Sequence, residues 1–200
     1  MFLFPKLVEQ KQSEINGTIQ VYKLWGKYSL RVDNLTQSGG LVKDIWQKAL
    51  QAIKQYQPSP VKTCLILGLG GGTAAALVNR FWPQALITAI ELDPVMIKLG
   101  KKYLNLGQVK HLKIINADAF SAIKHLKINF DLILVDLYHG QTIPSQALKP
   151  AFLNQLKRLK SPQGVIIFNF LYSLSLPRLD HHFSQIKLIK TPANRLLLVK

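Results

Sequence analysis

Short apolar runs recur along the middle of the chain, and polar or glycine-rich segments separate them. In chain order the runs are Cys64–Leu67, Ala85–Ile90, His111–Ile115, Phe130–Val135 and Val165–Phe170. A strand buried on both faces of a parallel sheet has this uninterrupted aliphatic character. Between the runs we expect helices, including Ala119–Leu126, Ala151–Leu159 and one that begins at Asp93-Pro94, with aspartate as N-cap. The alternation predicts an α/β, doubly wound, mostly parallel sheet.

The two ends of the chain have a different pattern. Residues Thr18–Leu24 and Tyr28–Asp33 alternate polar and apolar side chains around Trp25-Gly26-Lys27, which predicts a small N-terminal β-hairpin. A turn-rich stretch, 34–40, and an amphipathic helix, Val42–Tyr56, follow it. Near the C-terminus, Gln185–Lys190 and Arg195–Val199 predict an antiparallel hairpin, and Ser161–Gly164 a turn. We therefore expect an N-terminal β-hairpin appendage, residues 1–40, and a Rossmann-like domain, residues 41–200.

A glycine cluster follows the first apolar run and precedes a helix-forming segment. The sequence Val61–Thr73 reads VKTCLILGLGGGT, with glycines at 68, 70, 71 and 72. Glycine lets the backbone approach a ligand closely, and the helix start offers unpaired N–H groups. Glu91 ends the next strand about twenty residues later, where a carboxylate can accept both hydroxyls of a ribose. The phosphate-loop lysine and the strict GxGxxG spacing are missing, so a single nucleoside, with S-adenosylmethionine or a relative as the natural candidate, fits better than a nucleoside triphosphate or a dinucleotide.

Length and hydropathy limit the class of protein. The chain has 200 residues, enough for one ordinary domain, and 48% hydrophobic residues without an apolar run long enough to span a membrane. The N-terminus does not resemble a secretory signal, so we expect a cytoplasmic location and no membrane contact. The single cysteine, Cys64, lies in an apolar run and is expected to be a buried thiol. No Cys/His spacing or carboxylate cluster suggests a metal site.

The charge balance is strongly basic. The chain has 26 Lys and Arg against 10 Asp and Glu, a net charge of +16. Acids of the central unit lie at or beside strand ends: Glu91, Asp93, Asp118, Asp131 and Asp136. The remaining cationic surface favours weak contact with a polyanion, of which RNA is the first choice among nucleic acids. Lysine-biased composition without function is the alternative. The oligomeric state stays open, with a homodimer as one alternative.

Several ordered motifs resemble the spermidine synthases and their spermidine-synthase-like relatives. They are NLTQSG with Gln37, GLGGGT, AIELDP, NADAF, FDLILVDLYHG and SPQGVIIFN, followed by the closing hairpin. The resemblance covers most of the chain and implies the class I methyltransferase fold with an adenosyl sulfonium cofactor, either S-adenosylmethionine or decarboxylated S-adenosylmethionine.

The resemblance also implies roles for particular residues. Gly68, Gly70 and Gly72 would shape the pocket for the methionine end, Glu91 would hold the ribose, and Asp118 would face the adenine amino group. Asp136 would face the reacting centre as the base or acceptor-orienting group, with Tyr138 and His139 as helpers. Other expected cofactor contacts in the matched motifs are Gln37, Gly71 and Ala119. The alternatives are a helix N-cap for Asp118, a turn cap for Asp136 and an exposed loop position for His139.

The chain also departs from the family pattern. GLGGGT stands where aminopropyltransferases resemble GGGDGG, His139 replaces a second aspartate, and Trp46-Gln47-Lys48 replaces Tyr-His-Glu, which puts a cation where the family has an acid. A diamine substrate needs carboxylates at both ends. We therefore favour methyl transfer, with aminopropyl transfer to a polyamine as the second hypothesis and a non-catalytic nucleoside-binding or interaction role as the third.

Overall fold

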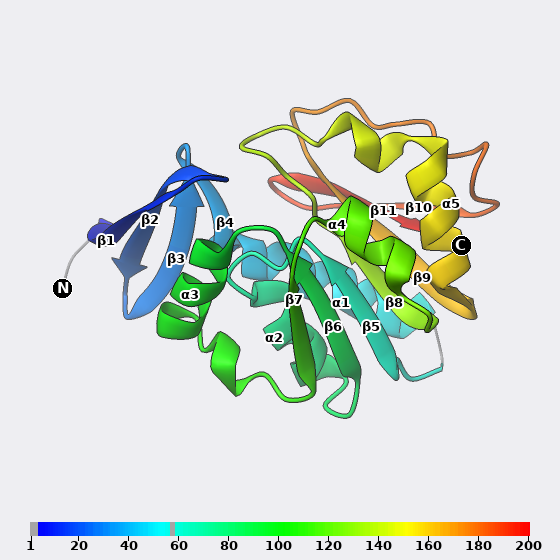
Figure 1. Ribbon diagram of the computed structural model, residues 1–200, viewed down its shortest axis with the longest axis horizontal. Helices are drawn as coiled ribbons and strands as arrows, with labels where there is room; N and C mark the ends of the chain where they lie inside the picture. Colours follow the sequence, from blue (N-terminus) through cyan, green and yellow to red (C-terminus); the bar gives the residue numbers. More distant parts are fainter. Residues whose placement is uncertain (1–3, 57–58) are drawn as a thin grey trace.

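The computed structural model describes residues 4–56 and 59–200 and contains two sheets (Figure 1). The larger sheet has seven strands in the order β10-β11-β9-β8-β5-β6-β7. Neighbours among β5, β6, β7, β8 and β9 run parallel, whereas β10 and β11 are antiparallel. The strands are β5 (Thr63–Leu67), β6 (Leu86–Glu91), β7 (Leu112–Asn116), β8 (Phe130–Val135), β9 (Lys160–Leu171), β10 (Ile186–Lys190) and β11 (Asn194–Val199). The expected doubly wound sheet with a C-terminal hairpin is confirmed.

Helices cover both faces of this sheet. They are α1 (Gly40–Tyr56), α2 (Thr73–Phe81), α3 (Pro94–Tyr103), α4 (Ala119–Ala122) and α5 (Pro150–Leu159), with short 3-10 helices η1 (Leu106–Gln108), η2 (Ile123–His125) and η3 (Ser145–Leu148). Buried side chains of α1 and α2 pack on one face, and those of α4 and α5 pack on the other. The expected helix 119–126 is divided between α4 and η2. Within the described part of the chain, no helix has the length and apolarity needed to cross a bilayer.

The N-terminal appendage is a four-stranded antiparallel sheet in the order β1-β2-β3-β4, larger than the expected hairpin. Its strands are β1 (Lys6–Ser13), β2 (Gly17–Leu24), β3 (Lys27–Val32) and β4 (Leu35–Gly39). Strand β1 was not predicted because it is mostly exposed and, apart from Leu7 and Val8, polar, so it lacks the alternation of polar and apolar side chains. The expectation that 34–40 is only a turn was wrong, since β4 pairs with β3 there. The expected turn Ser161–Gly164 likewise lies inside β9, opposite a register irregularity of β8.

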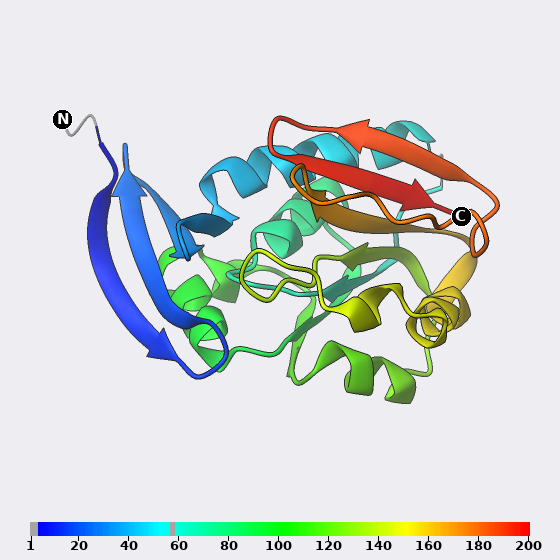
Figure 2. The same cartoon turned by 90° about the horizontal axis from the view of Figure 1, so that it is seen from above.

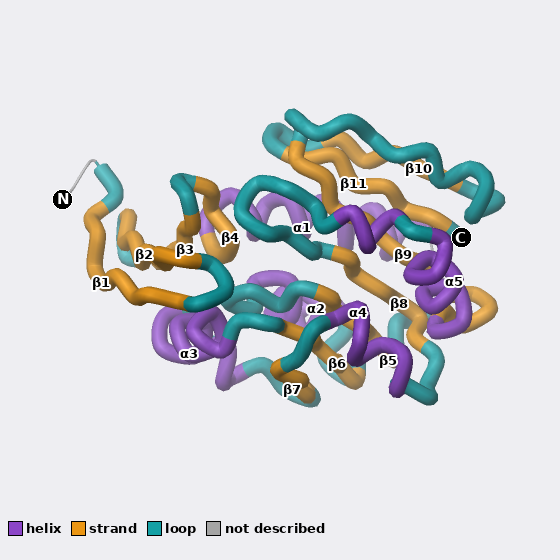
Figure 3. Tube along the Cα trace, turned by 45° about the horizontal axis from the view of Figure 1, so that its top comes forward, coloured by secondary structure: helices purple, strands orange, loops and turns teal. Residues whose placement is uncertain are grey.

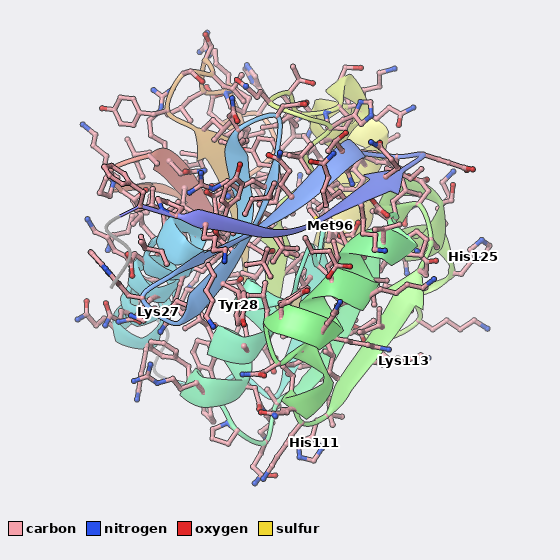
Figure 4. All side chains as sticks on the ribbon, turned by 90° about the vertical axis from the view of Figure 1, so that its left-hand side faces the viewer. Lys27, Tyr28, Met96, His111, Lys113 and His125 are labelled. Atoms are coloured by element: carbon pink, nitrogen blue, oxygen red, sulfur yellow. The ribbon has the colours of Figure 1, made fainter. Side chains whose placement is uncertain are left out.

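The small sheet stands at one end of the molecule and the β10–β11 hairpin at the other (Figure 2). Buried side chains of the small sheet, among them Val21 and Leu30, pack against Met96 and Leu99 of α3. Figure 4 shows Met96 beside the strands of this sheet. Polar contacts reinforce the docking, because the fully buried carboxylate of Asp93 accepts hydrogen bonds that tie the β1–β2 turn to the start of α3.

Asp93 also performs the capping role expected from the sequence. Its Oδ1 accepts a hydrogen bond of 2.8 Å from the N–H of Val95, and Pro94 is the first residue of α3. Its Oδ2 accepts from Ser13 Oγ at 2.6 Å and from Asn16 Nδ2 at 2.7 Å. The cap that begins α3 therefore also holds the β1–β2 turn above the strand ends.

Candidate functional site

The glycine loop joins β5 to α2 at the carboxyl edge of the large sheet. Gly68 has φ +87°, and a Cβ atom at this position would lie 2.1 Å from the carbonyl oxygen of Asp136. Only glycine fits both the backbone angle and the contact with the neighbouring β8 strand. Gly70 has φ +55° and donates its N–H to Glu91 Oε2 at 2.6 Å. The loop is thus fixed against the ends of β6 and β8, the two strands that flank β5.

Glu91 ends β6 and binds the glycine loop from the side. Its other oxygen, Oε1, accepts the N–H of Asp93 at 2.9 Å. Burial raises the pKa of Glu91, and the hydrogen bonds from Asp93 and Gly70 oppose this shift. Each carboxylate oxygen keeps further acceptor capacity, because an ionised oxygen has about two lone-pair sites. The side chain is therefore rigid and remains able to accept hydroxyl donors.

A cavity of about 350 Å³ opens above these strand ends. Loops that leave the strand ends gather between the two sheets, where they are drawn in teal in Figure 3. Most of the residues expected to form the site line this one cavity: Gln37, Gly68, Gly70, Glu91, Asp118, Ala119, Asp136, Tyr138 and His139. They come from β4 of the small sheet, from the glycine loop and from the segments that end or follow β6, β7 and β8. The fold therefore brings together positions spread over much of the chain.

Gly71 and Gly72, which were also expected to contact the cofactor, lie close to other elements of the protein. Neither is among the residues that line the cavity. A Cβ atom on Gly71 would lie 2.7 Å from Leu30 Cδ1, and one on Gly72 would lie 2.4 Å from Leu106 Cδ1. The Gly71 N–H donates to Ser38 Oγ at 2.7 Å. These two glycines allow close packing of the loop against β3, β4, α3 and η1.

Asp136 follows β8 and lines the cavity. Its Oδ2 accepts from Trp46 Nε1 at 3.2 Å, and its Oδ1 accepts from Asn169 Nδ2 at 2.8 Å. Both partners are neutral, and burial raises the pKa of Asp136 to about 6. At neutral pH most of the carboxylate is charged without a cationic partner. The alternative interpretation of Asp136 was a turn cap, and in the structure its carboxylate instead bonds to the side chains of Trp46 and Asn169.

The partners of Asp136 were missed in the sequence. Trp46 lies on α1, Asn169 on β9 and Asn194 at the start of β11. Asn194 Nδ2 donates to Asn169 Oδ1 at 2.8 Å, which leaves the amide nitrogen of Asn169 facing Asp136. The one available signal was the asparagine that interrupts the apolar run VIIFNF. A buried polar residue in such a strand requires a partner, and the partner is the carboxylate.

Tyr138 and His139 continue from Asp136 into the loop before η3. The Tyr138 hydroxyl donates to the Asn169 carbonyl at 2.9 Å and accepts from the Leu171 N–H at 2.8 Å. Burial raises the pKa of this phenol, and its two hydrogen bonds hold the loop to β9. His139 is exposed, and its Nε2 lies 3.2 Å from the carbonyl oxygen of Ile15 in the β1–β2 turn. Of the two, only His139 has an exposed side chain.

Asp118 serves as a helix cap and as part of the cavity wall. Its Oδ2 accepts the N–H of Ser121 at 2.9 Å at the start of α4. The same residue lines the cavity together with Ala119. Asp118 is therefore the N-cap of α4, as the alternative interpretation expected, and this hydrogen bond fixes its carboxylate in the loop after β7.

Lys48 does not occupy the position expected from the motif comparison. The side chain is exposed on α1 and is not among the residues that line the cavity. The expectation of a cation inside an amine pocket was therefore wrong. In an α-helix, residues two positions apart point in different directions, so Trp46 faces Asp136 while Lys48 faces outward.

The charge of the cavity is opposite to that of the chain. The carboxylates of Glu91, Asp118 and Asp136 line it, and among the residues that the structure describes no lysine or arginine does so. The whole chain has a net charge of +16. Residues 4–56 and 59–200 contain no group of three or more His, Cys, Asp or Glu that could hold a metal ion. This arrangement suits an organic cation.

The chain is similar to known proteins in sequence and in structure. A family model described as the spermine/spermidine synthase domain matches residues 43–173. A polyamine aminopropyltransferase of Vibrio vulnificus is 29% identical over 117 residues, which cover 57% of this chain and 39% of the relative. An eEF1A lysine and N-terminal methyltransferase homolog of Drosophila melanogaster is 32% identical over 117 residues, covering 54% of this chain and 17% of the relative. The chain thus matches less than two thirds of the length of either protein.

A solved structure shows the same fold over the full chain. The crystal structure of a probable spermidine synthase from Corynebacterium glutamicum superposes with a TM-score of 0.77 at 18% identity and covers 100% of this chain and 81% of that one. The relatives in sequence include both aminopropyltransferases and methyltransferases. Since the family model matches more than half of the residues of this chain, the chain belongs to the spermine/spermidine synthase family.

Proposed function

We propose that this protein is a transferase that binds S-adenosylmethionine and transfers its methyl group to a nucleophile held beside Asp136. The observation that carries the proposal is the cavity, which Glu91, Asp118 and Asp136 line without a lysine or arginine among the described residues, in a chain of net charge +16. Such a site favours a cationic ligand, and a sulfonium is a cation that also carries a transferable group.

The cofactor fits the residues present at the strand ends. Glu91 would accept the ribose hydroxyls, since its oxygens are fixed by the N–H groups of Gly70 and Asp93 and keep acceptor capacity. Asp118 and Ala119 would contact the adenine. Gly68, Gly70 and Gln37 would surround the methionine end, where Thr73 and Ala74 of the first turn of α2 also line the cavity. The first N–H groups of a helix favour a carboxylate such as that of methionine.

The chemistry needs an oriented acceptor and a place for one proton. When bound, the sulfonium supplies an already activated methyl group. Trp46 and Asn169 hold the Asp136 carboxylate, and its pKa of about 6 leaves it mostly ionised at neutral pH. Asp136 can therefore orient an acceptor and receive its proton. His139 lies on the same cavity wall, and Tyr138 fixes the backbone between them.

Methyl transfer is favoured over aminopropyl transfer by two positions. Gly71 stands where the aminopropyltransferase pattern has an aspartate, and Leu30, Leu104 and Ser38 occupy the space that its side chain would need. His139 stands where that pattern has a second acid. The acceptor side retains the carboxylate of Asp136 but lacks an acidic partner for the second ammonium group of a diamine.

Aminopropyl transfer is the second candidate, and one observation favours it. No lysine or arginine lines the described cavity, so a cofactor without a carboxylate would lose no ion pair there. The Vibrio vulnificus relative is itself named a polyamine aminopropyltransferase. A nucleoside-binding protein without catalytic activity is the remaining alternative.

Parallel reactions distinguish these functions. Purified protein is incubated with labelled S-adenosylmethionine plus cell extract, and with decarboxylated S-adenosylmethionine plus putrescine. We expect label transfer in the first reaction, loss of transfer in Asp136→Asn, and full transfer in Asp44→Asn, which changes an exposed aspartate that does not line the cavity. Methylthioadenosine and spermidine formed at enzyme-like rates would establish the second candidate. Nucleoside binding without either product would support the third.

A further inference from the structure

The turn between β2 and β3 consists of two residues, Trp25 and Gly26, which join the cross-strand pair Leu24 and Lys27. Both have positive φ, +48° for Trp25 and +77° for Gly26, as a two-residue type I′ turn requires. Asparagine, aspartate and glycine are favoured where Trp25 stands, because a bulky side chain is strained at positive φ. Trp25 is 65% exposed, and no hydrogen bond or ring contact joins its side chain to the part of the chain that the structure describes. The turn therefore presents a strained, exposed indole to solvent.

The face of the small sheet opposite α3 carries a second aromatic group together with a cation. Tyr22 of β2 and Arg31 of β3 lie on this face, since Gln20 is opposite Arg31 and Tyr22 is two residues further along β2. The Cζ atom of Arg31 lies 4.6 Å from the centroid of the Tyr22 ring, and both side chains are partly exposed. Among the described residues, no carboxylate pairs with Arg31, and its Nε has no hydrogen-bond partner. The pair is thus a flat, cationic surface.

The charges of the small sheet are divided between its two ends. Glu14, in the β1–β2 turn, and Asp33, directly after β3, lie at one end of the strands. Lys23 and Lys27 are exposed and flank the turn at the other end. Glu9, the other acid among residues 4–39, is held in ion pairs with two lysines. The end that carries Trp25 is therefore positively charged and attracts anions.

The start of β1 adds another exposed ring at this end. Lys6 of β1 lies opposite Lys23 of β2, so β1 begins beside the β2–β3 turn (Figure 2). Phe4, two residues before Lys6, is 79% exposed. Aromatic and cationic side chains therefore share one end of the small sheet, away from the candidate active site.

We propose that this end of the small sheet binds single-stranded RNA. Unpaired bases would stack on the indole of Trp25 and on the Tyr22–Arg31 pair. Lys23, Lys27 and Arg31 would contact the phosphates. Stacking on aromatic rings within a cationic surface is a general way to bind single strands, because every base has a flat π-face. None of these five residues lines the cavity, so the proposal does not depend on the proposed transferase activity.

The chemistry of this end favours single-stranded RNA over other anionic partners. A duplex hides the faces of its bases from the indole. The partly exposed amide of Gln20, on the same face as Arg31, can both donate to and accept from a ribose 2′-hydroxyl, which DNA lacks. A membrane-bound segment needs a continuous apolar face, whereas Lys23 and Lys27 stand two residues before and after Trp25.

Trp25→Asn separates a binding role of the indole from a structural one. The affinity of the full chain for a labelled oligouridylate of about ten nucleotides is measured by fluorescence anisotropy. We expect the substitution to weaken binding about fivefold or more, because it removes one stacking surface. Asparagine is favoured at this turn position, so denaturant unfolding should show equal or higher stability. Undiminished affinity for the oligouridylate in Trp25→Asn would overturn the proposal.

Heparin, a polyanion without bases, provides the control for charge. Trp25→Asn should leave the affinity for heparin unchanged, since no base stacks there. Equal weakening of RNA and heparin binding would show that the turn contributes no stacking and would overturn the proposal.

Two exposed lysines test the location. Lys27→Gln should weaken RNA binding and lower the slope of log affinity against log salt by about 0.7, the contribution of one phosphate contact on a single strand. Lys113→Gln is the matched control, because Lys113 is exposed on β7 and lies apart from Lys27 in Figure 4. Equal effects of the two substitutions would show that the whole surface binds RNA without a site.

Other partners are tested in the same assay. Oligodeoxyuridylate of equal length and duplex RNA compete with the labelled oligouridylate, and both should compete more weakly than unlabelled oligouridylate. Equal or stronger competition by either would overturn the assignment to single-stranded RNA. Vesicles of phosphatidylglycerol should not shift the fluorescence of Trp25, and a shift with vesicles combined with no RNA binding would assign this end of the sheet to a membrane.

Discussion

The side-chain amide of Asn169 on β9 donates a hydrogen bond of 2.8 Å to the carboxylate of Asp136, which follows β8. Asn194 of the C-terminal hairpin fixes the other end of that amide at 2.8 Å. The network is neutral apart from the carboxylate, so it orients Asp136 without cancelling its charge. The hairpin, which is remote from the glycine loop in sequence, thereby becomes part of the candidate site.

The ionisation of Asp136 gives a prediction for pH. Burial raises its pKa to about 6, and only the ionised form can accept a proton. Turnover should therefore be low at pH values well below 6 and should rise to a plateau above it. The profile is measured as initial rate against pH in wild-type protein, with Asp44→Asn as a control that keeps the same midpoint. A flat profile through this range would remove Asp136 as the base.

Asn169→Leu tests the network that holds Asp136. The hydrogen bond from Asn169 favours the ionised carboxylate, so its loss should raise the pKa of Asp136. A hydrogen bond to a charged group contributes roughly 1.5–3 kcal/mol, and the midpoint of the pH profile should move upward by about one to two units. Asn79→Leu, which changes an asparagine that does not line the cavity, should leave the midpoint in place. An unchanged midpoint in Asn169→Leu would show that the amide has only a packing role.

Glu91→Ala should weaken nucleoside binding. The substitution removes the carboxylate proposed to hold the ribose and also the acceptor for the N–H groups of Gly70 and Asp93. Loss of charge-assisted hydrogen bonds of roughly 1.5–3 kcal/mol corresponds to about tenfold or more in affinity. Calorimetry with S-adenosylmethionine measures the change. Glu14→Ala, at an exposed position outside the cavity, is the control, and equal affinity in both variants would contradict the assignment.

Gly68→Ala should destabilise the protein and disturb the site. The new methyl group would lie 2.1 Å from the Asp136 carbonyl oxygen at a φ of +87°, so the loop or β8 must move. Strain and overpacking of this kind cost about 1–3 kcal/mol each, and denaturant unfolding should show the loss. Gly107→Ala is the control, because a Cβ atom there would have no heavy atom beyond its chain neighbours within 4 Å and the φ of Gly107 is not positive. Equal stability of the two variants would contradict the predicted clash.

The basic surface gives a prediction about polyanions. In the described chain, the ion pairs of the acids join Glu9 to Lys11 and Lys102, and Asp180 to Arg178, which leaves most cations without an acidic partner. Nitrogen-tipped side chains project around the outline of the face in Figure 4. Binding to heparin or RNA should therefore fall steeply with salt and depend little on sequence. If the protein is no longer retained on heparin or RNA at near-physiological salt, the positive charge reflects a lysine-biased composition and not a polyanion-binding function.

Local patterns in the sequence were enough to predict the segments of the large sheet and the acids at or beside its strand ends. Residues 130–135 form β8 as expected, and Asp93 caps α3 as expected, because both depend on local features: continuous apolar character, N-cap chemistry and proline at the first helical position. The position of Glu91, Asp118 and Asp136 at or beside strand ends followed from the same pattern, since parallel strands end at one edge of a sheet.

Tertiary structure alone decided which of these residues meet and what they do. Trp46 and Asp136 are separated by 90 positions, and their hydrogen bond exists because α1 packs on the face of the sheet beside β8. Other tertiary contacts turn Lys48 outward, pair β1 with β2 and β4 with β3, and place Leu30 beside Gly71. Such contacts depend on the order of strands and the rotation of helices, which side-chain periodicity within a short segment does not specify.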